Sequence, residues 1–294
     1  MGGVHACTRC SFFDLSMALV NYDGKILNAA EPLLNIENRS FRYGDGLFES
    51  MRVIEGEVVM LERHIARLEK GLQVLKMSNG PAHDSGFWKE QILTLCEQNA
   101  CSDNGRIRLT VFRKGGGYYV PEEDGFCYLI EADLNTTLFS DKEAEGLAIG
   151  VFNEIKKPIN ELGRVKTANS LIYVLAGIAR VQHKMDDMII LNQEGRVAEA
   201  ISSNIFVVKN GEVSTPSLDE GCVAGVTREW LIEKMKDEGI FVKETRLSID
   251  NLYSADEVFV SNAIQGVRKV SKADDVEFLS ELVEELFKFK PELD

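Results

Sequence analysis

The chain has 294 residues, 45% of them hydrophobic and 27% charged, a composition typical of globular proteins that excludes a largely disordered chain. Its net charge of −14, with no basic block to offset it, argues against a nucleic-acid-binding protein. No apolar run approaches the roughly 18–20 residues that cross a bilayer, and the first residues lack the apolar centre of a signal peptide. We therefore expect a cytoplasmic protein with no membrane partner.

The six cysteines are scattered along the chain, and the CxxC formed by Cys7 and Cys10 has no second pair at the spacing of a metal site. We expect no metal site. In the absence of a secretion signal, we also expect reduced thiols. Residues 1–12 are a candidate disordered segment outside the fold.

The first half of the chain alternates strand and helix patterns. Two hairpins are indicated by turns at Asp23-Gly24 and Glu55-Gly56. Apolar residues recur at helical spacing after the second hairpin, and a glycine-rich loop separates the last two strands of this half. The expected elements are hairpins over 17–30 and 50–61, helices over 61–77 and 87–100, and strands over 106–114 and 126–132.

A polar stretch, 133–146, interrupts this pattern, and we interpret it as a linker between a small α/β domain over 1–132 and a larger one over 147–294. The expected elements of the second domain are strands over 147–152, 188–191, 204–209 and 256–260, and helices over 167–184 and 227–238. The prediction is an α/β fold of the α+β type. Two such domains predict a ligand site in the cleft between them.

Lys166 stands just before the apolar run 171–175, which predicts a buried helix face. A lysine at the edge of a core is ordinarily a solvated charge, but it is also where an amine can face a cavity. Three later stretches are potential partners, each with an ordinary alternative. Glu199 precedes a strand, and Thr227 lies in the first turn of a helix, where N–H groups and the dipole suit a phosphate. A buried strand ends in "SNA" at 261–263.

In the order of its motifs, this chain resembles the class IV aminotransferases. The motifs are Lys166, then Glu199 at a distance of 33 residues, then "GVTR" at 225–228, and then "SNA". These are pyridoxal 5′-phosphate (PLP) enzymes of fold type IV, and they include branched-chain and D-amino-acid transaminases and aminodeoxychorismate lyase. "FRYGDGLFES" and "ERHIARL" extend the resemblance over about residues 20–270.

The resemblance implies that Lys166 carries PLP as a Schiff base and shuttles the substrate proton, and that Glu199 pairs with the pyridine nitrogen. It implies phosphate contacts from Arg67, Val226, Thr227, Asn262 and Ala263. A planar guanidinium fits a phosphate better than an ammonium does. Arg164, two residues before Lys166, would assist only if its side chain turned inward.

The resemblance also implies a homodimer with the active site near the subunit contact. Aromatic and apolar residues beside the glycine turn at 44–46 are candidates for that contact; they are Phe41, Tyr43, Leu47 and Phe48. Packing within their own domain is the alternative.

The substrate stays open in the sequence. Phe48 replaces the tyrosine of the "GDGVYE" pattern of D-amino-acid transaminases. "RKGGGYYVP" keeps Arg113 but lacks the second arginine of an "RGxGGRGY" pattern seen in some lyases, and the "YxRP" of branched-chain enzymes is absent. Phe48 is a candidate substrate contact. The candidate carboxylate binders are Arg106, Arg108 and Arg113, each of which could instead be an exposed strand charge.

We expect an aminotransferase that moves an amino group between an amino acid and a 2-oxo acid, with branched-chain amino acids among the candidates. The first alternative is 4-amino-4-deoxychorismate lyase, which eliminates pyruvate to give 4-aminobenzoate in the folate pathway. A metabolite-binding protein that has lost catalysis is a remote alternative.

Overall fold

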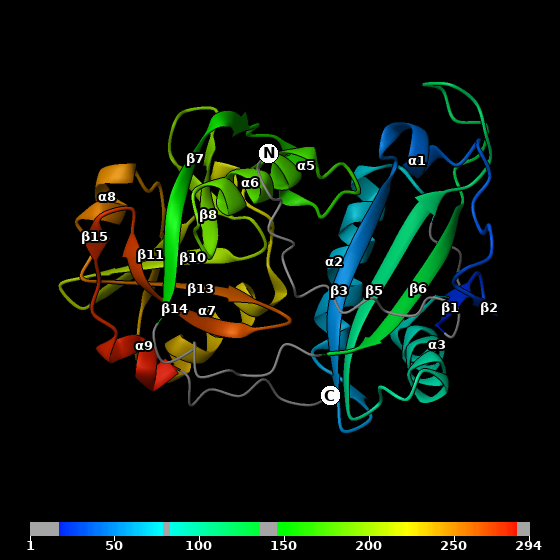
Figure 1. Cartoon of the computed structure of the whole chain (residues 1–294), viewed down its shortest axis with the longest axis horizontal. Helices are drawn as coiled ribbons and strands as arrows, with labels where there is room; N and C mark the ends of the chain where they lie inside the picture. Colours follow the sequence, from blue (N-terminus) through cyan, green and yellow to red (C-terminus); the bar gives the residue numbers. More distant parts are fainter. Residues whose placement is uncertain (1–17, 79–82, 136–145, 287–294) are drawn as a thin grey trace, which may run out of the picture.

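The computed structural model describes residues 18–78, 83–135 and 146–286. It contains two sheets, which lie in two lobes side by side (Figure 1). Residues 1–12 and the Cys7–Cys10 pair lie outside the described residues, and so does 136–145, the central part of the expected linker. The last strand of the first sheet ends at Leu134 and the first strand of the second begins at Leu147.

The first sheet is antiparallel, with strand order β2-β1-β6-β5-β3-β4. Both expected hairpins form, and the turn residues Asp23 and Gly24 have φ angles of 52° and 83°, as a two-residue turn requires. The elements of this lobe are β1 (Leu19–Tyr22), β2 (Lys25–Asn28), α1 (Arg39–Tyr43), β3 (Gly46–Ile54), β4 (Glu57–Val58), α2 (Leu61–Val74), α3 (Ser85–Gln98), β5 (Asn104–Arg113) and β6 (Phe126–Leu134).

Alternation along β3 and β5 assigns their side chains to two faces. Met51 and Ile107 are fully buried in a core that includes Leu68 of α2 and Ile92 of α3. The alternate residues of β3 and β5 lie on the opposite face of the sheet, which is turned toward the second lobe. Helices therefore cover one face of this sheet, and the other face is left to line a site.

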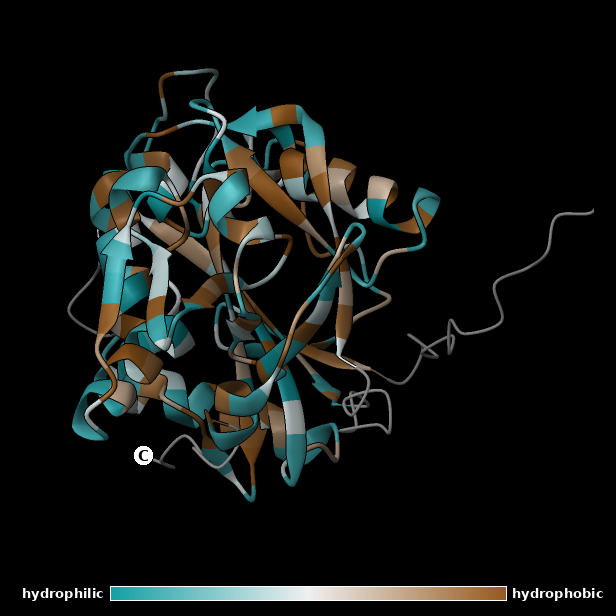
Figure 2. Cartoon of the chain, turned by 90° about the vertical axis from the view of Figure 1, so that its left-hand side faces the viewer, coloured by the Kyte–Doolittle hydropathy of each residue, from teal (hydrophilic) through white to brown (hydrophobic). Residues whose placement is uncertain are grey.

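The second sheet mixes parallel and antiparallel pairs in the order β12-β11-β10-β13-β14-β7-β8-β9, with β15 beside β14. Its strands are β7 (Leu147–Lys157), β8 (Asp187–Asn192), β9 (Val197–Ala200), β10 (Asn204–Lys209), β11 (Glu212–Pro216), β12 (Val242–Thr245), β13 (Glu257–Asn262), β14 (Gly266–Ala273) and β15 (Val276–Glu277). Its helices are α5 (Glu161–Arg164), α6 (Leu171–Gln182), α7 (Val226–Asp237), α8 (Ile249–Tyr253) and α9 (Glu281–Leu286), with a 3₁₀ turn at Leu218–Glu220. Figure 2 faces this lobe and shows apolar and polar bands alternating along its strands and helices. The predicted α+β type is confirmed.

The helix predicted over 167–184 begins later, at Leu171, because the residues before it pair with the first sheet. The N–H of Phe48 donates to the carbonyl of Lys166 at 3.0 Å, and the N–H of Ala168 donates to the carbonyl of Gly46 at 2.8 Å. These bonds hold 166–168 extended against the start of β3 and tie the two lobes together.

The predicted buried face of α6 is wrong in part. Leu171 is 70% exposed and Val174 is 54% exposed, whereas the small residues Ala176 and Ala179 are buried. The helix thus packs through these small side chains and through the half-buried Ile172 and Tyr173, whereas Leu171 and Val174 point outward.

Among the candidates for a subunit contact, Leu47 is only 2% exposed and belongs to the core of its own lobe, so that expectation is wrong for Leu47. Phe41 is 78% exposed, and Tyr43 packs against the ring of Tyr119 at 5.7 Å between centroids. Within the described residues, no helix combines the length and apolar character that crossing a membrane requires.

Candidate active site

A cavity of about 600 Å³ lies between the two lobes. The first lobe contributes the free face of β3 and β5 and one arginine of α2. The second contributes the segment from the end of β7 to the start of α6, the end of β9, the start of α7 and the end of β13. The sequence-predicted residues that line it are Phe48, Arg67, Arg106, Arg108, Lys166, Glu199, Val226, Thr227, Asn262 and Ala263.

Lys166 reaches this cavity from the extended segment before α6. Its Nζ lies 4.3 Å from the centroid of the Phe48 ring. Desolvation, followed by the nearby charge of Arg67, lowers the pKa of Lys166 to about 8, against the opposing effect of Glu49 and Glu199. A neutral amine is therefore accessible near neutral pH. Arg164 points away from this amine and forms an ion pair with Asp219 at 2.5 Å.

Arg67 is held by a carboxylate from the neighbouring strand. Its Nε donates to Glu49 Oε1 at 2.8 Å, a terminal nitrogen donates to Glu49 Oε2 at 2.5 Å, and the other donates to the carbonyl of Ala224 at 3.0 Å. Burial acts to raise the pKa of Glu49, but Arg67 and the hydrogen bond from His64 lower it to about 2. Three of the five guanidinium N–H groups are thus engaged by described residues, and two remain for a ligand.

Glu199 lies within β9 and is 3% exposed. Its Oε1 accepts a hydrogen bond from the Tyr173 hydroxyl at 2.7 Å and contacts the ammonium of Lys157. Its Oε2 accepts a bond from the N–H of Val223 at 2.8 Å. Because a carboxylate can accept about four hydrogen bonds, one position on Oε2 stays available to a donor in the cavity.

The first turn of α7 presents backbone N–H groups to the cavity, because no side chain caps it. Its N-cap residue, Gly225, touches β10 so closely that a Cβ there would meet Asn204 Oδ1 at 1.9 Å. A larger residue at this position would require the Asn204 side chain to move. Thr227 is buried beside it, and its Oγ1 has no partner among the described residues.

The end of β13 forms a second polar edge of the cavity. Asn262 accepts hydrogen bonds from the N–H groups of Ile264 and Gln265 through Oδ1 and donates to Ser203 Oγ at 2.9 Å. Ser261 is 2% exposed and its Oγ also lacks a partner within the described chain. Two buried hydroxyls, an uncapped helix start and a guanidinium are donors suited to a phosphate.

Arg106 and Arg108 alternate with buried residues of β5 and project from the face that lines the cavity. The guanidinium carbon of Arg108 stacks 3.9 Å from the centroid of the Phe48 ring. These two cations lie on the wall that the first lobe contributes to the cavity, where they can bind a carboxylate.

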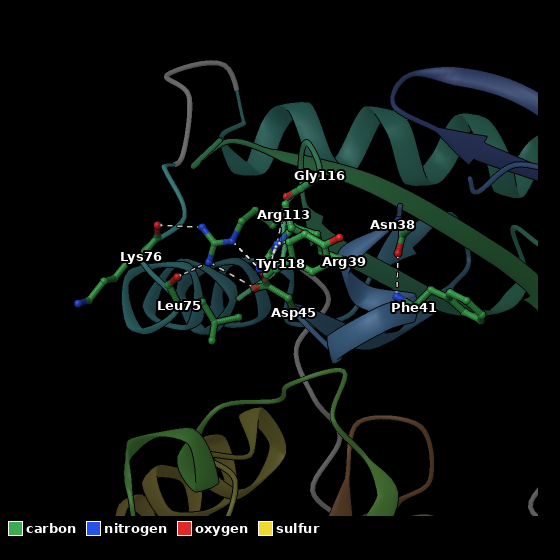
Figure 3. A network of polar contacts seen from close by, with 10 residues as sticks. Asn38, Arg39, Phe41, Asp45, Leu75, Lys76, Arg113, Gly116 and Tyr118 are labelled. Carbon is green, nitrogen blue, oxygen red and sulfur yellow. Dashed lines mark hydrogen bonds and ion pairs between the residues drawn. The ribbon is translucent and has the colours of Figure 1, made fainter. Parts of the chain in front are cut away.

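Arg113 lies outside the cavity, so it is not a ligand-binding candidate there. It is 7% exposed, and its side chain donates to Asp45 and to the carbonyls of Leu75 and Lys76, as Figure 3 shows. Arg39 shares Asp45 and donates to the carbonyls of the glycine loop (Figure 3). An odd-numbered position on β5 faces opposite to Arg106 and Arg108, which explains the difference.

Four residues of the site carried no predicted role. Glu49 and His64 lie inside the quoted "FES" and "ERHIAR" stretches, and His64 precedes Arg67 by three residues, which places both on one side of α2. Lys157 and Tyr173 gave no such signal, because their common partner Glu199 is distant in the sequence.

The cavity therefore combines an amine of lowered pKa, a buried carboxylate and a group of donors suited to a phosphate. A sequence model described as "Amino-transferase class IV" matches residues 46–273. A Methanocaldococcus jannaschii protein provisionally named branched-chain-amino-acid aminotransferase is 30% identical over 86% of each chain. The aminodeoxychorismate lyase of Bacillus subtilis is 28% identical over 90% of this chain and 89% of its own.

The fold agrees with these similarities. A T.th. branched-chain amino acid aminotransferase, solved with pyridoxamine 5′-phosphate, superposes with a TM-score of 0.83 at 23% identity and 92% coverage of each chain. The matched segment extends from β3 to β14 and so includes every cavity-lining residue that the sequence predicted. The chain belongs to the class IV aminotransferase family, whose enzymes are PLP-dependent aminotransferases and lyases.

Proposed function

We propose that the protein is an aminotransferase that uses PLP to move an amino group between an amino acid and a 2-oxo acid. The observation that carries the proposal is the amine of Lys166, with a pKa of about 8, in one cavity with Glu199 and a group of donors suited to a phosphate. When bound, PLP supplies an electron sink that allows an amino acid to lose its Cα proton.

The residues of the chain have distinct tasks in this proposal. Lys166 attaches the cofactor and afterwards takes the Cα proton on Nζ. Glu199, which has an acceptor position left on its carboxylate, would hold a proton at the ring nitrogen. The phosphate would be bound by the two free donors of Arg67, the hydroxyl of Thr227 and the N–H groups of α7, together with Asn262 and Ala263 at the end of β13. The ring of Phe48 limits access of water to Lys166.

A half-reaction assay tests this function. Purified protein loaded with PLP should convert it to pyridoxamine 5′-phosphate when mixed with the right member of a panel of L- and D-amino acids, and branched-chain ones should be included. A 2-oxo acid should reverse the change. Protein that binds PLP but reacts with no amino acid, and releases no pyruvate from aminodeoxychorismate, would contradict both enzymatic assignments.

The lyase is a second candidate because the Bacillus subtilis relative bears that name. Both reactions begin with loss of a proton to Lys166 and differ afterwards. Release of pyruvate from aminodeoxychorismate, without conversion of PLP to pyridoxamine 5′-phosphate by any amino acid, would identify the lyase.

The lowered pKa of Lys166 leads to a prediction about pH. Its usual value is 10.5, and the amine is neutral above its own pKa, so attachment of PLP to cofactor-free protein should speed up with rising pH only to about 8. Above that, the rate should level off. Visible absorbance followed after mixing measures the rate, with Lys166→Ala as a blank. A rate that continues to rise tenfold per pH unit between 9 and 10 would contradict the prediction.

Arg108 is the stronger candidate for the substrate carboxylate because it is stacked on Phe48 near Lys166. Arg108→Met should raise KM for the amino acid by about 10–100-fold, the effect of one charge-assisted hydrogen bond, with little change in PLP binding. Arg42→Met is the matched control, since Arg42 is exposed and outside the cavity. A KM unchanged in Arg108→Met would mean that another group binds the carboxylate.

We propose further that the protein is a homodimer whose contact includes the outer face of α6. Leu171, Val174, Ile178 and Val181 are each at least 50% exposed and recur every three or four residues, so they share one side of the helix. Soluble monomers seldom expose such an apolar stripe.

Light scattering at micromolar concentration should therefore give twice the 32.8 kDa of one chain. Ile178→Asp should shift the mass toward one chain, because it buries an unpaired charge in the contact. Phe241→Asp is the control, since Phe241 is 79% exposed elsewhere. A mass of one chain for active unmodified protein would refute the dimer.

A further inference from the structure

A buried lysine at the base of the cavity has no part in the tasks described above. Lys157 is 4% exposed at the end of β7, and its ammonium contacts Glu199 Oε1. The pairing of β7 with β8 shifts register between Phe152 and Lys157. This irregularity changes the direction of the side chains beyond it, and the end of β7 brings the Lys157 ammonium to Glu199 of β9.

The surroundings of Lys157 hold the ammonium in one position. Its Nζ lies 5.4 Å from the centroid of the Tyr173 ring, and the hydroxyl of that ring donates to the same carboxylate oxygen that Lys157 contacts. Both ends of Glu199 are thus fixed, Oε1 by Lys157 and Tyr173, and Oε2 by the N–H of Val223. The carboxylate cannot rotate without breaking one of these bonds.

We propose that Lys157 is a positioning residue that balances the charge of Glu199 and keeps its carboxylate aimed while the cavity holds no cofactor, and that the ring nitrogen of PLP then shares Glu199 with it. The inference rests on the proposed function. A buried carboxylate without a partner is strongly destabilising, so the apoprotein needs a counter-charge that arrives with the chain itself. Lys157 supplies it.

The presence of Lys157 changes how much PLP can stabilise the protein. With Lys157 present, an ammonium already balances the charge of Glu199. A protonated ring nitrogen therefore adds less stabilisation than it would beside a carboxylate without a partner. Without Lys157, the cofactor is the main counter-charge of Glu199. Removing Lys157 should therefore weaken the apoprotein more than it weakens the protein with PLP bound.

Thermal unfolding with and without PLP tests this proposal. Lys157→Met should lower the melting temperature of the apoprotein by roughly 5–10 °C. Adding PLP should raise the melting temperature of this variant by more than it raises that of the unmodified protein. Lys157→Arg should recover most of the loss. Lys156→Met is the matched control, because Lys156 is the neighbouring cation on the cavity wall and hydrogen-bonds Asn153 instead of Glu199.

The double variant Lys157→Met/Glu199→Gln separates the charge from the packing. It removes both charges at similar volume, so its apoprotein should melt higher than that of Lys157→Met, even if the single variant folds poorly. Equal losses with and without PLP, or a double variant that is less stable than Lys157→Met, would overturn the inference. No change in the melting temperature of the unmodified protein on adding PLP would instead overturn the proposed function and the cofactor part of this inference with it.

Discussion

Lys166→Ala is expected to abolish turnover while the fold stays intact. Attachment of the cofactor and transfer of the Cα proton depend on the same Nζ, so both are lost together. The decrease in kcat/KM should be about 10⁵-fold or more. Steady-state assays with the best substrate of the panel measure it, and circular dichroism checks the fold.

The local structure supports an intact fold in this variant. Residue 166 is held by its backbone carbonyl, which accepts from the N–H of Phe48, and an alanine keeps that bond. Lys166→Arg should fail similarly because a guanidinium stays charged and cannot attach the cofactor. Lys156→Ala is the control for loss of a cation from the cavity. More than a few per cent of activity remaining in Lys166→Ala would refute the assignment of Lys166.

Local sequence signals predicted much of the fold. The hairpin turns at Asp23-Gly24 and Glu55-Gly56 form as expected, because a two-residue turn needs positive φ angles at both positions and glycine adopts one readily at the second. The apolar spacing after the second hairpin produced α2 at Leu61–Val74. These elements depend mainly on near neighbours in the chain.

The start and the burial of α6 could not be predicted in this way. Residues 166–168 prefer the edge of β3, a partner more than 100 residues away, to another helical turn. The outward direction of Leu171 and Val174 depends on which side of the helix the sheet occupies. Apolar periodicity identifies a stripe, but it does not identify what covers it.

The site residues also divide into those that local sequence patterns could predict and those that they could not. Arg106 and Arg108 could be separated from Arg113 by the two-residue period of β5, since strand faces follow from counting. The contact of Lys157 with Glu199 could not, because it arises from the register of β7 and β8. Contacts across a sheet require the topology, which the sequence pattern does not contain.

The second large effect is expected from Glu199→Gln. A neutral amide can still accept the hydrogen bond from Val223, but it cannot hold a proton at the ring nitrogen of PLP, so the ring draws electrons less strongly. We expect kcat to fall about 10²–10³-fold. PLP should still bind, because Arg67 and the first turn of α7 hold the phosphate independently of Glu199.

Glu199→Gln also leaves the ammonium of Lys157 buried without its counter-charge, so a loss of activity alone could reflect a damaged fold. The double variant Lys157→Met/Glu199→Gln resolves this ambiguity. Its stability should recover, since neither charge remains, whereas its kcat should stay low, since no carboxylate faces the ring. Single-turnover rates measured beside melting temperatures distinguish the two effects. Recovery of kcat together with stability would show that Glu199 serves the fold and has no role at the ring nitrogen.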